Sequence, residues 1–351
     1  MSRLSSSNRF LQWFFPRRKA LEEPPQRQSL AQDHVVILDG TMSSSAPGHE
    51  TNAALLYRLL EAQAPKVKVY YRPGQQWIDL RSGWDVLVGG NMNTQIRRAY
   101  GALATRFRPT DRIYLFGYSR GAYAVRSLSG MINHVGLLKR EYATPRHIQQ
   151  AWRFYQTNTS GAVLEKFRAA HCHDVIEIEM IGVWDTVRAL GLPIISRWRQ
   201  ARYGFHNHAL SPVVNAGYQA LALNEARIAF SPVKWECSAQ PNTRVQQVWF
   251  RGNHGDVGGH LGGFFAARRL SNIPFIWMLE RAENHGLVLP KGWQQGYPID
   301  PKAPSTGPWR GIGKLFFLRK KRRVDLSCCE SIHPSAEPYK GDWCSDETSQ
   351  L

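Results

Sequence analysis

The residues best suited to chemistry in this chain are Gly117-Tyr118-Ser119-Arg120-Gly121. They follow a strand-like run, 112–116, and precede a helix-like run, 122–132. A strand, Gly-x-Ser-x-Gly and a helix form a nucleophile elbow, a sharp turn that exposes the serine hydroxyl. The five-residue pattern alone occurs in about one random chain of this length in ten. We predict that Ser119 is a nucleophile, with a small residue in a tight turn as the alternative.

An elbow serine needs a base to take its proton and an acid to orient that base. The usual order along the chain is serine, acid, histidine. Asp185 ends the strand-like run 175–184, and His254 follows the strand-like run 244–250. Both side chains are therefore expected at the carboxyl edge of a parallel sheet, where ligands bind in open α/β folds.

Each partner of the serine has an alternative reading. Asp185 precedes Thr-Val-Arg and would also serve as a helix N-cap. Asp256 is too near His254 in the sequence to be the first choice of acid, and it is assigned to supporting the histidine loop. The base could also be one of three other histidines: His260, His285 or His333.

The tetrahedral intermediate of an acyl transfer needs amide donors for its oxyanion. The amide of Arg120 is one candidate, and the turn after the first strand offers Gly40 and Thr41, where glycine allows close backbone approach. Asp39 is expected to hold this turn or to bind a polar part of the substrate.

A metal is the alternative reading of the polar loops. Carboxylates and imidazoles stand close together in the sequence at Asp39, His254, Asp256 and His260. Their spacing does not match a zincin-type motif, so neither a metal nor a cofactor is expected.

Alternating strands and helices must position these residues. The expected strands are 34–38, 67–71, 111–116, 175–184 and 244–250, and the expected helices are 51–64, 95–107, 216–228 and 273–285. This alternation predicts an α/β protein with a mostly parallel sheet and right-handed crossovers. The expected organisation is a polar and basic tail (1–33), a catalytic domain (34–300) with lid-like insertions (136–172 and 186–215), and a basic C-terminal extension (301–351).

The net charge of +18 predicts attraction to an anionic partner. Aromatic residues lie beside clustered cations between Trp13 and Lys19 and between Arg310 and Arg323. This combination is typical of segments that bind anionic bilayers, and a solvated basic face is the alternative. Nucleic acid is not expected, because no zinc-finger, RNP or bZIP pattern occurs.

The sequence also bears on membrane spans, a signal peptide and paired cysteines. No apolar run approaches the roughly 18 residues that span a bilayer, and the N-terminal segment is too basic after a short apolar part for a signal peptide. Of the five cysteines, three are scattered and two, Cys328 and Cys329, are adjacent, which predicts reduced thiols in a protein folded in the cytoplasm. Peripheral membrane association is expected, and delivery by a non-classical secretion system would need no signal peptide.

Several separate motifs together resemble the α/β-hydrolase family that includes the phospholipase effectors of bacterial type VI secretion and related fungal proteins. They span about residues 35–285 in the family's order. The motifs are Leu38-Asp39-Gly40-Thr41, Phe116-Gly117-Tyr118-Ser119-Arg120-Gly121-Ala122, Gly182-Val183-Trp184-Asp185-Thr186-Val187, Ala220-Leu221-Ala222-Leu223-Asn224-Glu225-Ala226-Arg227, and Trp249-Phe250 through His254-Gly255-Asp256-Val257-Gly258-Gly259.

The resemblance implies a Ser119–Asp185–His254 triad and hydrolysis of carboxylic ester bonds in lipids, often phospholipids. Departures from the family pattern lie outside the triad: Met42-Ser43-Ser44, Asn224, Gly255 and His260. The first and last of these bear on the oxyanion turn and on specificity. The rival functions are an esterase for small soluble esters and an inactive hydrolase-fold module that binds anionic membrane. A secretion or immunity partner is left open.

Overall fold

The computed structural model describes residues 31–41, 43, 46–64, 66–74, 92–187, 209–237, 244–307, 318–324 and 329–342. The chain divides into a short unit, Met1–Ala31, and a large unit, Gln32–Leu351. All elements described below belong to the large unit. No described helix is long and apolar enough to cross a bilayer.

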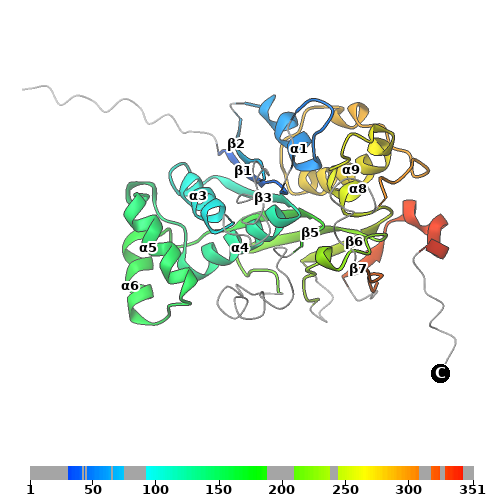
Figure 1. The fold of residues 1–351 in the computed structure, drawn as a ribbon. Helices are drawn as coiled ribbons and strands as arrows, with labels where there is room; N and C mark the ends of the chain where they lie inside the picture. The colour runs from blue at the N-terminus through cyan, green and yellow to red at the C-terminus, as the bar shows by residue number, and fades with distance from the viewer. Residues whose placement is uncertain are drawn as a thin grey trace, which may run out of the picture. The chain divides into compact units, whose positions relative to one another are not determined.

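The large unit is built on a seven-stranded sheet in the order β2-β1-β3-β4-β5-β6-β7, and every neighbouring pair is parallel (Figure 1). The strands are β1 (Asp33–Leu38), β2 (Val67–Arg72), β3 (Arg112–Tyr118), β4 (Ile178–Trp184), β5 (Val214–Ala222), β6 (Val245–Phe250) and β7 (Glu330–Ile332). The predicted α/β class with a parallel sheet is confirmed.

Helices cover both faces of this sheet. The α-helices are α1 (Asn52–Glu61), α3 (Met92–Ala104), α4 (Arg120–Val135), α5 (Pro145–Gln156), α6 (Ala162–His171), α8 (His254–Gly258) and α9 (Arg268–Asn284). The 3₁₀ helices are η1 (Arg140–Tyr142), η2 (Ile228–Phe230), η3 (Phe265–Ala267), η4 (Trp293–Gly296) and η6 (Pro334–Asp342). Helices α3, α4 and α5 contribute to the core on one face, and α1 and α9 to the core on the other (Figure 1).

Strand β1 shows why the sheet is buried on both faces. Val36 and Leu38 enter the core beside α3 and α4, whereas Val35 and Ile37 enter the core beside α1 and α9. Successive side chains of a strand point to opposite faces, so a parallel strand covered twice reads as a continuous apolar run. The sequence 34–38 has this pattern.

The expected helix 216–228 is wrong, because this segment contains strand β5. Its alanines and leucines have helical spacing, but β5 lies between β4 and β6 and is buried on both faces. Small side chains fit this interior position. The fully buried Gln219 accepts a hydrogen bond from the Thr186 hydroxyl at 2.6 Å, so its polar group is satisfied inside the sheet.

Two expected boundaries also change. The expected C-terminal extension, 301–351, supplies β7, so the sheet continues beyond the expected end of the domain at residue 300. The expected insertion 136–172 contains α5 and α6, and Trp152 and Phe167 of these helices are buried in the core beside α3 and α4. This helical pair is therefore part of the packed domain. Of the insertion expected at 186–215, residues 188–208 lie outside the described part.

A disulfide joins Cys237 to Cys329, which corrects the expectation of reduced thiols for this pair. Because the two residues are separated by 92 positions, their spacing carried no signal of pairing. Cys172 is buried and free. Cys328 and Cys344 lie outside the described residues.

Candidate active site

The turn between β3 and α4 places Ser119 at the carboxyl edge of the sheet. Ser119 has φ 57° and ψ −120°, a backbone conformation that costs a non-glycine residue free energy. Glycine is required on both sides of it. A Cβ at Gly117 would lie 2.6 Å from the Cα of Ala122, and a Cβ at Gly121 would lie 2.0 Å from the carbonyl oxygen of Leu38.

Three side chains from separate loops meet at this turn. The hydroxyl Oγ of Ser119 lies 2.8 Å from Nε2 of His254. The other ring nitrogen of His254, Nδ1, lies 2.6 Å from Oδ2 of Asp185. An ionised carboxylate only accepts, so Nδ1 carries a proton and Nε2 is left to accept the proton of the serine hydroxyl. The arrangement can therefore pass a proton from the hydroxyl to the imidazole.

Burial strengthens the interactions within this group. Asp185 is 0% exposed, His254 is 4% exposed and Ser119 is 7% exposed. Charges and hydrogen bonds interact more strongly in such an environment than in water. The three side chains are consequently held in a shielded position at the end of the sheet.

The loop after β4 fixes the carboxylate of Asp185. Asp185 has φ 44°, and its amide donates to the carbonyl of Ala220 at 2.8 Å. Its Oδ1 accepts from the amide of Ala222 at 3.1 Å. Asp185 is thus tied to the end of β5, and it does not cap a helix within the described part of its loop.

Helix α8 begins at His254 and is fixed by a capping box. The Asn253 side chain accepts from the amides of Gly255 and Asp256, and the Asp256 carboxylate accepts from the amide of Asn253 at 2.9 Å. Asp256 also accepts from the amide of Thr306 at 2.9 Å. The Asp256 carboxylate therefore binds the loop around His254.

Aromatic rings enclose the imidazole. The ring of Tyr118 stacks on that of His254 at 4.9 Å between centroids, and the ring of Phe230 lies 4.8 Å away. The Tyr118 hydroxyl donates to the His254 carbonyl at 3.2 Å. The His254 amide donates to Glu225, which also pairs with Arg227. Sequence reasoning gave Glu225 and Arg227 no role beyond their place in a motif.

Arg322 is the residue at this site that sequence reasoning missed. Its guanidinium contacts both carboxylate oxygens of Asp185, at 2.6 Å and 2.9 Å. Burial raises the pKa of Asp185, but the charge of Arg322 and hydrogen bonds from His254 and Arg322 outweigh it and lower the pKa well below its ordinary value. The sequence analysis had grouped Arg322 with the cations of a membrane-binding segment.

The turn after β1 lies beside the serine. A Cβ on Gly40 would come within 3.2 Å of the Cβ of Ser119. The Gly40 amide donates to Oδ1 of Asp39 at 2.7 Å, so this amide is committed to a carboxylate. Thr41 follows in the same turn, and Arg120 begins α4, where the first amides lack partners within the helix.

Asp39 is a buried carboxyl at this turn. Its Oδ2 accepts from the hydroxyls of Thr51 and Tyr71 at 2.6 Å and 2.9 Å. Burial raises the pKa of Asp39 to about 6, although hydrogen bonds from Thr51, Tyr71 and the turn oppose the rise. These contacts place Asp39 as a holder of the turn.

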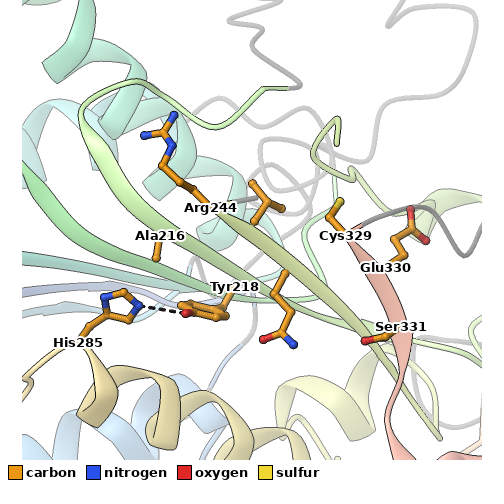
Figure 2. A pocket seen from close by; sticks show the side chains of 9 residues that line it. Ala216, Tyr218, Arg244, His285, Cys329, Glu330 and Ser331 are labelled. Atoms are coloured by element: carbon orange, nitrogen blue, oxygen red, sulfur yellow. Dashed lines mark hydrogen bonds between the residues drawn. The ribbon is translucent and has the colours of Figure 1, made fainter. Parts of the chain in front are cut away.

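The three alternative histidines lie elsewhere. His260 follows α8, and burial lowers its pKa to about 4. His333 stacks on Phe250 at 4.7 Å and contacts the hydroxyl of Ser335. His285 contacts the hydroxyl of Tyr218 at 2.9 Å (Figure 2). None of them has a hydrogen bond to Ser119 among the described contacts.

Tyr218 and His285 line a hollow of about 500 Å³. Figure 2 shows the side chains around it. Arg244 and Glu330 also line it. Val245 and Glu330 are the first residues of β6 and β7, so the hollow lies at the amino edge of these strands, opposite the edge that carries Ser119.

The described residues bear on the expected absence of a metal and on one of the two basic aromatic segments. Among these residues, no three His, Cys, Asp or Glu side chains are grouped to hold a metal ion. The segment from Trp13 to Lys19 lies outside the described part, as does the first half of the segment from Arg310 to Arg323. In its second half, Lys320, Lys321 and Arg323 are exposed.

Comparisons with known proteins give a family match over most of the chain. The catalytic-domain model of the type VI secretion phospholipase effectors of the Tle1-like family matches residues 32–281. The uncharacterized protein YEL023C of Saccharomyces cerevisiae is 29% identical over 196 residues, which are 48% of this chain and 28% of that protein. This chain therefore spans less than a third of that relative.

Two solved structures are similar at low sequence identity. An uncharacterized protein from Pseudomonas aeruginosa is 16% identical, with a TM-score of 0.45 over 78% of this chain and 48% of that one. The Tle1 effector bound to the VgrG spike of the type VI secretion system is 18% identical, with a TM-score of 0.39 over 65% of this chain and 51% of that one. This chain therefore spans about half the length of each of these two proteins.

The family match includes Ser119, Asp185 and His254 but ends before Arg322. It takes in six of the seven strands and leaves out β7. The chain belongs to the Tle1-like phospholipase effector family, of which it carries the catalytic domain.

Proposed function

We propose that this protein is a serine-dependent phospholipase that cleaves carboxylic ester bonds of membrane phospholipids. The observation that carries the proposal is the continuous hydrogen-bonded chain from Ser119 through His254 to Asp185. Membership of a family of phospholipase effectors supplies the substrate class.

The chemistry follows from the two hydrogen bonds. Nε2 of His254 takes the proton of Ser119 while Oγ attacks the acyl carbonyl carbon. The resulting imidazolium is stabilised by the carboxylate of Asp185. When the tetrahedral intermediate collapses, the imidazolium returns its proton to the leaving lysophospholipid oxygen. Water, deprotonated by the same imidazole, then attacks the acyl-enzyme and releases a fatty acid.

The oxyanion of the intermediate needs amide donors beside Oγ. We assign one to Arg120, at the start of α4, and one to the turn after β1. Because the Gly40 amide already donates to Asp39, the amide of Thr41 is the remaining candidate in that turn. Removal of one such donor costs about 2.7–4 kcal/mol of transition-state stabilisation in comparable sites.

Anionic membrane is the proposed site of action. Exposed cations at Lys320, Lys321 and Arg323 lie beside Leu318, which is 67% exposed. Clustered cations next to an exposed apolar side chain favour the interface of an anionic bilayer. Delivery by a secretion system is proposed on the ground of the family alone.

The test compares wild type with Ser119→Ala on vesicles of phosphatidylglycerol and phosphatidylethanolamine, with products identified by mass spectrometry. Wild type is expected to release fatty acid and lysophospholipid, and Ser119→Ala to release neither. Equal product from both proteins would refute the assignment of the nucleophile. Turnover of monomeric short-chain esters that matches turnover of vesicles would instead favour an esterase for soluble substrates. Vesicle binding without any turnover would favour an inactive binding module.

A further inference from the structure

We infer that Arg322 is a positioning residue for Asp185, the acid of the triad. The active site then includes a residue that lies outside the range matched by the family's catalytic domain, 32–281. The inference rests on the proposed function. It concerns a segment, 318–324, that follows the matched residues 32–281 by more than thirty positions. From the sequence, this segment is predicted to bind anionic membrane or to form a solvated basic face.

The guanidinium of Arg322 and the carboxylate of Asp185 form a two-point contact. Nη1 donates to Oδ1 at 2.6 Å, and Nη2 donates to Oδ2 at 2.9 Å. The side chain of Arg322 is 4% exposed and that of Asp185 is 0% exposed. A planar guanidinium matches a carboxylate in this way, which a lysine ammonium does not.

The same guanidinium is anchored to the backbone on either side of the site. Nη1 also donates to the carbonyl of Ala222 at 2.9 Å, and Nη2 donates to the carbonyl of Phe230 at 2.5 Å. Ala222 ends β5, and the ring of Phe230 lies against His254. Arg322 therefore links three parts of the active site.

The segment before Arg322 is fixed to the loop after β5. The amide of Lys320 donates to the carbonyl of Ala226 at 2.7 Å, and the amide of Ile228 donates to the carbonyl of Leu318 at 3.1 Å. Arg319 and Arg227 form an antiparallel bridge between the same two stretches. These backbone contacts bring the Arg322 side chain to the end of β4, where Asp185 lies.

Two consequences for the triad follow from this contact. First, Arg322 fixes the rotation of the Asp185 carboxylate, which leaves Oδ2 aimed at Nδ1 of His254. Second, its charge compensates a carboxylate that has no exposure to water. Loss of the partner of a buried charge is costly, and the carboxylate of Asp185 would then act on the imidazole of His254 without a compensating cation.

The test measures the rate at which a small, water-soluble fluorophosphonate labels Ser119 between pH 5 and pH 9. A monomeric probe removes any effect of membrane binding. We expect Arg322→Gln to lower the rate at pH 7 by about 10²-fold, less than the ~10⁴-fold that follows impairment of a triad acid. The pH of half-maximal labelling should rise by about one unit or more, because without the cation the negative potential around the imidazole favours its inactive, protonated form.

Other charged and titratable groups around His254 stay constant in this comparison. They are Tyr118 on β3, Glu225 and Arg227 after β5, and Asp256 and His260 on and after α8. Arg322→Lys separates the effect of the positive charge from the effect of the two-point contact, since lysine keeps the charge but cannot contact both carboxylate oxygens of Asp185 in the same way. It should label about 10-fold more slowly than wild type, with a half-maximal pH near that of wild type.

Arg146→Gln is the control, because it also replaces an arginine by glutamine but removes an exposed cation from α5, which has no part in the site. It should label at the wild-type rate. Arg322→Gln with the wild-type rate and pH profile would overturn the inference while leaving the proposed function in place. A slower rate with an unchanged pH profile, together with a lower melting temperature, would also overturn it by indicating a structural role alone. If wild type is not labelled at Ser119 at all, the proposed function fails and the inference fails with it.

If Arg322→Gln does not fold, the test uses Arg322→Lys in its place. Its labelling rate relative to that of Arg146→Gln then decides the outcome. A wild-type rate in the lysine variant would show that the two-point contact has no part in positioning Asp185.

Discussion

Asp39 offers a quantitative check on the electrostatics of the turn beside Ser119. Its side chain is buried, and burial raises its pKa from 3.8 to about 6 against the opposing hydrogen bonds. The folded protein therefore binds this proton more tightly than the unfolded chain does. Stability from this group is fully present below about pH 3.8 and is lost as the pH rises through about 6.

The magnitude follows from the shift. About two pKa units correspond to about 3 kcal/mol at 1.36 kcal/mol per unit, and this is the free energy that ionisation of Asp39 removes from folding. Asp39→Asn does not ionise, and its amide oxygen can still accept from the Gly40 amide. The difference in unfolding free energy, variant minus wild type, should therefore rise by up to about 3 kcal/mol between pH 4 and pH 7.5.

Urea unfolding at half-unit steps of pH measures this difference. Tyr71→Phe is a useful companion, since it removes one hydroxyl donor to the carboxylate and should raise the Asp39 pKa further. A difference between wild type and Asp39→Asn that stays constant with pH would refute the reasoning, as would one that falls as the pH rises.

Three further substitutions test the geometry of the site. Ser119→Gly should abolish hydrolysis yet raise stability by about 1 kcal/mol in thermal unfolding, because it relieves the positive φ; a lower melting temperature would contradict this. Asp256→Ala should cost about 3 kcal/mol in urea unfolding, since three donors lose a buried acceptor; a cost under about 1 kcal/mol would count against that role. Gly258→Ala would place its Cβ 1.8 Å from Cε2 of Tyr118, so turnover and stability should both fall, by about 1–3 kcal/mol for stability. Gly296→Ala, where a Cβ meets no atom within 4 Å, is its control and should leave turnover unchanged.

Local patterns predicted the elements that carry the serine, the aspartate and the histidine. The run 113–116 is apolar and is followed by Gly-x-Ser-x-Gly, and both the strand and the turn are set by residues next to one another in the chain. The same holds for the strands that end before Asp185 and His254. Chain order predicted His254 as the base among four candidate histidines. In the structure, Nε2 of His254 contacts the hydroxyl of Ser119.

Other features depend on neighbours that are remote in the sequence. The alanine-rich stretch of β5 has helical spacing, and only its position between two strands makes it a strand. Arg322 pairs with Asp185, 137 positions away, and no local pattern separates it from the exposed cations beside it. The Gly40 amide was expected to face an oxyanion, whereas the adjacent Asp39 carboxylate accepts its hydrogen bond.

The disulfide and β7 belong to the same group of features. Strand β7 has three residues, too few for a periodic pattern, and it forms by pairing with β6. Cys329 immediately precedes β7 and is bonded to Cys237, so the start of β7 is fixed near β6 by contacts that arise on folding. Strand β7 and Cys329 lie beyond the matched family domain, as Arg322 does, whereas Cys237 lies within it.

The most direct test of the central claim is to locate the covalent adduct of a phospholipid-like fluorophosphonate. The protein is treated with the probe, digested, and its peptides are sequenced by mass spectrometry, with His254→Ala as the companion variant. The adduct is expected on Ser119 in wild type and should form at least about 10³-fold more slowly in His254→Ala, because the base that activates the hydroxyl is missing. An adduct on a different residue, or equal rates in the two proteins, would contradict the account.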